Sequence, residues 1–178
     1  MYEQSIMKLS SRARVACAAI HFEQFCLSRS LEISYLHEAV EWLIDFACIR
    51  NEGSSFTRWR EKQPRLIDVG LGYSVDEVES GIAFAISDPR LRRSFFYINE
   101  SVVEVLFTSL EGRPSEEQSR LFLSRSLEEM SKYGCSVVLD PPMPVPWIDS
   151  GWGVPLVRTQ VQTWITNLRI KQEGQRFA

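Results

Sequence analysis

The chain has 178 residues, of which 44% are hydrophobic and 24% are charged, and its formal net charge at pH 7 is −3. This length predicts one domain, and the apolar content is enough for a buried core without disulfides or metals. The slight acidic balance offers no basic excess for nucleic acid or anionic lipid. Neither a signal peptide nor an apolar stretch long enough to span a membrane is recognisable, so a cytoplasmic protein is expected.

The first third of the sequence predicts two long helices. Residues 5–30 carry small and apolar side chains at helical spacing. Residues 34–50 carry two adjacent apolar stripes, one with Leu43 and the other with Trp42 and Phe46. A helix that is apolar over so wide a surface packs on several sides, and we therefore expect residues 34–50 to be the most buried element.

Shorter elements are expected next. Residues 54–59 predict a short helix, whereas residues 66–69 are expected to be extended or in a loop. Ser74 and Glu77 have the spacing of a capping box, in which each side chain bonds a free backbone N–H of the other. This pattern predicts a helix over residues 74–86.

Further start and stop signals follow. Asp88, followed by a proline, marks a helix start, and Asn99 is expected to cap a separate helix that Gly112 ends. Residues 115–133 predict another helix, and residues 135–139 have the composition of a single short strand.

The C-terminal part combines an irregular segment with a last helix. Five prolines and two glycines lie within residues 141–155, so no regular element is expected there. Residues 157–171 have a helical apolar pattern, and residues 172–178 are expected to fray. The sequence thus predicts a mainly α fold, a single-domain bundle of about six or seven helices over residues 1–171.

Acidic residues are concentrated in the middle of the sequence. Five acids and no Lys or Arg occur from Asp68 to Asp88, and three more acids without a base occur from Asn99 to Glu111. Such a run favours a basic protein partner, for which tryptophans on a stiff loop are suitable anchors. The predicted partner-binding residues are Asp76, Glu77, Glu79, Glu104, Glu111, Trp147 and Trp152. The alternative is a solvated acidic face, with both tryptophans folded back onto the bundle.

Residues suited to catalysis or metal binding are sparse. Cys17 and His21 share a helix face, and Cys26 and His37 are further potential ligands, but structural zinc sites need paired close spacings. The Gly-Leu-Gly turn at 70–72 lacks the third glycine of a dinucleotide-binding loop. We therefore expect no catalytic, metal or cofactor site, no enzymatic activity, and four reduced thiols.

Two stretches of the sequence resemble small all-helical immunity proteins that accompany bacterial polymorphic toxins. The first comprises ARVA and FEQFC within residues 13–26 together with AVEWL at 39–43, and the second is SVVEVLFTSLEG at 101–112. The resemblance covers residues 1–135 and includes no catalytic signature. It implies a cytosolic antidote that binds a cognate toxin domain and blocks its active site. A helical adaptor or regulatory protein, and an enzyme whose site is assembled only in the fold, are the alternatives.

Overall fold

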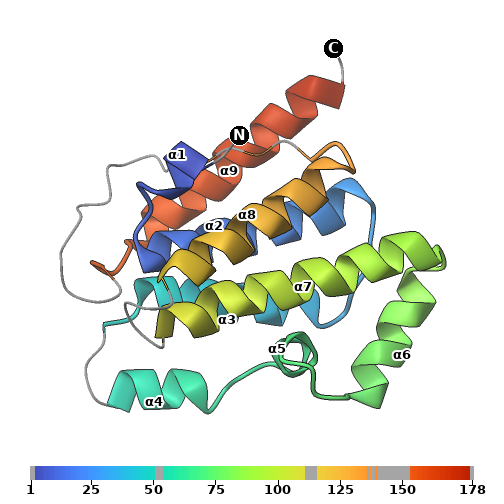
Figure 1. The fold of residues 1–178 in the computed structure, drawn as a ribbon, viewed down its shortest axis with the longest axis horizontal. Coiled ribbons are helices and arrows are strands. Elements are labelled where there is room, and N and C mark those ends of the chain that lie inside the picture. Colours follow the sequence, from blue (N-terminus) through green and yellow to red (C-terminus); the bar gives the residue numbers. More distant parts are fainter. Residues whose placement is uncertain are drawn as a thin grey trace.

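The structure, a computed structural model, is a bundle of α-helices (Figure 1). It describes residues 3–50, 54–110, 116–135, 137, 139 and 153–176, and these residues form nine helices and no strand. The predicted mainly α bundle is confirmed, and the additional helices are short. The helices are α1 (Glu3–Ile6), α2 (Ser11–Ser28), α3 (Leu36–Cys48), α4 (Ser54–Arg60), α5 (Arg65–Gly70), α6 (Asp76–Ala85), α7 (Pro89–Leu110), α8 (Glu116–Ser131) and α9 (Arg158–Arg176).

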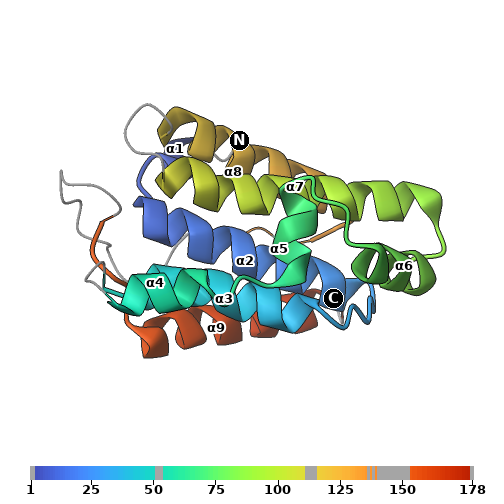
Figure 2. The ribbon, with the colours of Figure 1, turned by 90° about the horizontal axis from the view of Figure 1, so that it is seen from below.

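Helix α2 is the central element of the bundle. It packs against α3 on one side and against α7 and α8 on another, with α9 also in contact (Figure 2). Nearly all of its residues are buried, including the polar Arg12, Arg14 and His21. The prediction that residues 34–50 form the most buried element is therefore wrong. These three side chains each form a hydrogen bond within the protein, which their sequence positions do not reveal.

A pair of tryptophans attaches α4 to α3. Trp42 is buried, as predicted, with 5% of its surface exposed, and its ring stacks on Trp59 with the ring centroids 4.2 Å apart. The indole Nε1 of Trp42 donates to the backbone oxygen of Trp59 at 2.9 Å, and Nε1 of Trp59 donates to the backbone oxygen of Trp42 at 2.8 Å. Trp59 is the buried residue of α4, so this pair accounts for the attachment of that helix.

The region around α5 and α7 differs from its prediction. Residues 65–70 form a helix instead of an extended segment, and Pro89–Leu110 is one continuous helix. Asn99 is therefore not a helix cap: its side chain is buried, and Nδ2 donates to the backbone oxygen of Leu66 at 3.0 Å. The two helices approach so closely that a Cβ at Gly70 would lie 2.5 Å from Cγ2 of Val103. Asn99 thus serves a tertiary contact with α5.

The start of α6 also differs from the predicted capping box. The N-cap residue is Val75, which makes no side-chain cap bond, so Ser74 is not the cap. The carboxylate of Glu79 takes the expected role of Glu77, because it accepts from the backbone N–H of Val75 at 3.2 Å and from Oγ of Ser74 at 3.1 Å. Glu77 is bonded elsewhere, which explains why the local pattern was misleading.

The C-terminal part is described only in pieces. Cys135, Val137 and Leu139 do not belong to a strand, and the Pro/Trp-rich residues 140–152 lie outside the described residues. The predicted last helix is present as α9. It continues to Arg176, beyond residue 172, where fraying is expected from the sequence.

Candidate protein-binding site

The predicted partner-binding residues fall into separate groups. Asp76, Glu77 and Glu79 lie together in the first turn of α6. Glu104 is half-buried on α7, about 22 Å along that helix from the end that joins α6, at 1.5 Å per residue. Helix α6 packs on α5 and diverges from α7 (Figure 1). The remaining predicted residues, Glu111, Trp147 and Trp152, lie outside the described residues.

Glu77 is engaged within the protein. Oη of Tyr35 donates to Oε1 of Glu77 at 2.7 Å, and the guanidinium of Arg65 forms an ion pair with Oε2. The hydrogen bond from Tyr35 and the charge of Arg65 lower the pKa of Glu77. These contacts tie the start of α6 to the beginning of α3 and to α5. Glu77 therefore positions the helix, although it remains exposed.

Two other acids of the same segment direct their charge to solvent. Asp76 is exposed and is within 3.5 Å of Oγ of Ser74, and Asp88 accepts the backbone N–H of Arg90 at 2.8 Å. Neither carboxylate forms an ion pair with any residue that the structure describes. Their charges thus remain available to a partner.

Phe84, in the last turn of α6, is 93% exposed. Among the large apolar side chains of the described residues, the next most exposed is Tyr73 at 65%, in the turn before α6. The buried residues of α6 are Val78 and Ile82, which lie on the opposite face of the helix from Phe84. Phe84 is not among the residues predicted to bind a partner, although its position away from the Val78 and Ile82 stripe is a signal that could have identified it.

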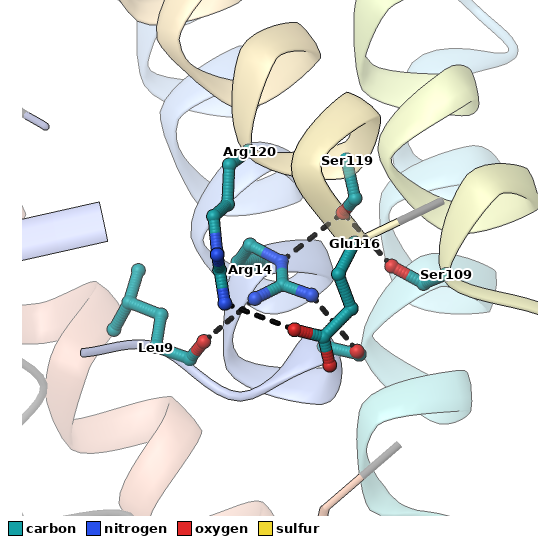
Figure 3. A network of polar contacts seen from close by, with 7 residues as sticks. Leu9, Arg14, Ser109, Glu116, Ser119 and Arg120 are labelled. Carbon is teal, nitrogen blue, oxygen red and sulfur yellow. Dashed lines mark hydrogen bonds and ion pairs between the residues drawn. The ribbon is translucent and has the colours of Figure 1, made fainter. Parts of the chain in front are cut away.

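A second polar cluster surrounds Arg14, deep in the bundle (Figure 3). The side chain is fully buried, and its Nε donates to Oγ of Ser119 at 3.1 Å. Nη1 donates to the backbone oxygen of Leu9 at 2.8 Å, and Nη2 donates to Oγ of Ser11 at 2.9 Å. The hydroxyl of Ser119 also lies 2.9 Å from that of Ser109. Arg14 therefore links the segment before α2 to α8 directly, and to α7 through Ser119.

The charge of Arg14 is maintained despite its burial. Desolvation lowers the pKa of Arg14 to about 10, while the nearby carboxylate of Glu116 opposes this shift. Glu116 is itself paired with Nη2 of Arg120 at 2.9 Å. At pH 7 Arg14 is thus still protonated, and each of its three guanidinium nitrogens donates a hydrogen bond. The cluster is structural.

The potential catalytic and metal-binding residues are also placed in the core. Sγ of Cys17 lies 3.5 Å from Nδ1 of His21, which is 2.8 Å from the backbone oxygen of Cys17. Burial raises the pKa of the Cys17 thiol and lowers the pKa of His21 to about 4, so both are neutral at pH 7. His37 lies apart from them, exposed on α3. No cluster of three or more metal-ligating side chains occurs within the described ranges.

A hollow of about 580 Å³ opens between α1 and α8. Its lining contains neither histidine nor cysteine, and the guanidinium of Arg120 in its wall is already paired within α8. The hydroxyl of Ser124 in the lining donates to Glu128 on the same helix at 3.0 Å, so the hollow brings no histidine or cysteine to a serine. The residues that line it are Gln4, Ile6, Met7, Glu117, Arg120, Leu121 and Ser124.

No protein-family model, curated protein or solved structure matches the chain. Each helix that the structure describes is too short or too polar to span a bilayer. Over its described residues the protein is a helical bundle that displays an almost fully exposed aromatic side chain, Phe84, on the acidic helix α6.

Proposed function

We propose that the protein is a cytoplasmic antidote of the immunity type, which neutralises a cognate bacterial toxin domain by binding it. The observation that carries this proposal is Phe84, which is 93% exposed on α6 between the outward-facing Asp76 and Asp88. Exposing a phenylalanine sacrifices about 1.5–3 kcal/mol of burial free energy, and aromatic residues are enriched at protein interfaces. The resemblance to immunity proteins supports a toxin as the partner.

The mechanism is stoichiometric occlusion. One antidote molecule covers the active site of one toxin domain, and a specific interface of this kind buries about 800 Å² on each partner. Acidic side chains such as Asp76 attract a basic partner and raise the association rate. An aromatic side chain seated in a pocket mainly slows dissociation.

A helical adaptor or regulatory protein is the second candidate, because the same exposed aromatic helix suits any protein partner. The two functions differ in what binding achieves, since an antidote abolishes a toxic activity and an adaptor does not. An enzyme is a weaker alternative, because His21 is buried and neutral while His37 lies exposed on another helix.

The test is co-expression with the polypeptide encoded by the adjacent open reading frame. An antidote should co-purify with that polypeptide in a 1:1 complex, and it should restore the growth of cells that produce the polypeptide. If the folded protein leaves its toxicity unchanged and no complex forms, the proposed function is refuted. A 1:1 complex with a non-toxic polypeptide would instead support the adaptor.

A further inference from the structure

Helix α6 is attached to the bundle along one face and exposed on the other. Val78 and Ile82 are fully buried on that face, and Ile86, directly after the helix, is 2% exposed, so apolar packing provides most of the attachment. The exposed contacts of Glu77, with Tyr35 on the α3 side and Arg65 on α5, add to the positioning of its first turn. A helix anchored in this way presents its last turn in a defined orientation, and binding to that turn requires little ordering.

The last two turns of α6 expose an aromatic side chain beside a glycine. Phe84 projects three residues after Gly81, on neighbouring positions of one helix face. Gly81 is exposed and has no side chain, and a Cβ placed there would reach only the ring of Tyr35, at 4.0 Å. The surface beside Phe84 is thus low, which leaves both the face and the edge of its ring accessible.

The charges on either side of Phe84 indicate what kind of surface would cover it. Asp76 precedes Phe84 by eight residues and Asp88 follows it by four, and neither forms an ion pair within the part of the chain that is described. Burying these carboxylates against an apolar or acidic surface would be costly. The acidic segment ends at Asp88, because Arg90 and Arg93, which follow it on α7, are exposed and basic.

We infer that α6 is the recognition helix of the proposed antidote. Phe84 enters an apolar pocket on the partner protein, and the rim of that pocket carries Lys or Arg side chains opposite Asp76 and Asp88. This inference rests on the proposed function and names the partner chemistry of the same site. It assigns the main anchor to Phe84, on the described surface, rather than to the tryptophans of the C-terminal segment.

The charges favour a different protein over a second copy of this chain. Two copies of α6 in contact would bring Asp76 and Asp88 of one copy near those of the other, and like charges oppose association. A stable interface needs about 800 Å² on each side. A concave partner can cover Phe84 and also Tyr73, which is 65% exposed in the turn before α6.

The experiment measures binding kinetics between the purified protein and the polypeptide of the adjacent open reading frame, inactivated if it is toxic. Phe84→Ala should raise the dissociation rate about 30-fold or more, as expected for an anchor residue. Leu121→Ala is the matched control, because Leu121 is a 46% exposed apolar side chain on α8, and its rates should remain within about twofold of the wild type. Both variants should retain the melting temperature of the wild type.

The charged residues are tested separately with the Asp76→Asn/Asp88→Asn variant. Asparagine preserves the acceptor that caps the start of α7, so the fold should be unaffected. The variant should associate more slowly and with a weaker salt dependence, while its dissociation rate changes little. An association rate equal to that of the wild type at low and high salt would overturn the basic rim.

The outcomes separate the inference from the function on which it rests. If the wild type does not bind the polypeptide, the proposed function fails and the inference fails with it. If the wild type binds and Phe84→Ala dissociates at the rate of Leu121→Ala, the antidote stands and the recognition helix is overturned. If Phe84→Ala instead abolishes self-association in sedimentation experiments and leaves binding unchanged, α6 is a contact between copies.

Discussion

Trp42→Ala should be among the most destabilising single substitutions in the bundle. The side chain is 5% exposed and stacked on Trp59 at 4.2 Å, and its indole N–H is bonded to the backbone of α4. Truncating a buried tryptophan costs about 3–5 kcal/mol, since apolar burial is lost and a cavity remains. For a chain of this size each kcal/mol lowers the melting temperature by roughly 2–4 °C, so a decrease of roughly 6–20 °C is expected.

The free energy of unfolding is measured by urea denaturation, with circular dichroism as the probe, and local opening is measured by hydrogen exchange on the same variants. Trp59→Phe is the graded control, because it keeps an aromatic ring but removes the N–H that bonds the Trp42 carbonyl and part of the buried indole, so it should cost less than Trp59→Ala. Trp59→Ala should mainly release α4, whose buried residue it is, so exchange should accelerate in residues 54–60 more than elsewhere. A loss below 1 kcal/mol in Trp42→Ala would refute the assignment of this pair to the core.

Three further predictions concern packing, pH and metal. Gly70→Ala should cost about 1–3 kcal/mol, because its Cβ would overlap Val103, whereas Gly81→Ala should stabilise by up to about 1 kcal/mol; thermal denaturation compares them. Between pH 6.5 and about 4 the unfolded chain binds a proton that buried His21 does not, so the unfolding free energy should fall as the pH falls, by up to about 1.4 kcal/mol per pH unit; His21→Gln should weaken this dependence in urea titrations. Metal analysis should find no stoichiometric zinc, and one zinc per chain would point first to Cys17.

Much of the helical architecture is predictable from the sequence. Helical spacing of apolar residues identifies α2, α3, α8 and α9, because this periodicity is a property of each segment alone. The burial of Trp42 follows from the same pattern. The order of burial does not follow from it, because an arginine such as Arg14 is expected at the surface until its partner Ser119 on α8 is known.

At the candidate site, the local sequence predicts the acidic charge but not the hydrogen bonds of the acidic side chains. The acidic segment from Asp68 to Asp88 is visible in the sequence, but the spacing of Ser74 and Glu77 predicts a cap that the structure does not contain. Glu77 bonds Tyr35, which is 42 positions away in the chain. The helix start is therefore determined by a distant partner.

Asn99 and Phe84 show that residue type alone does not determine where a side chain lies in the fold. Asparagine is a favoured residue at the start of a helix, yet Asn99 lies inside α7. Its side chain bonds Leu66 on α5, because the two helices pack closely there. Phenylalanine is a residue type usually found in the core, yet Phe84 is 93% exposed, because no element packs on that face of α6 in the described structure. Propensity and periodicity act over one or two turns of a helix, so they determine which segments are helical. Burial and the choice of hydrogen-bond partner depend on contacts between residues tens of positions apart, and these only the tertiary structure decides.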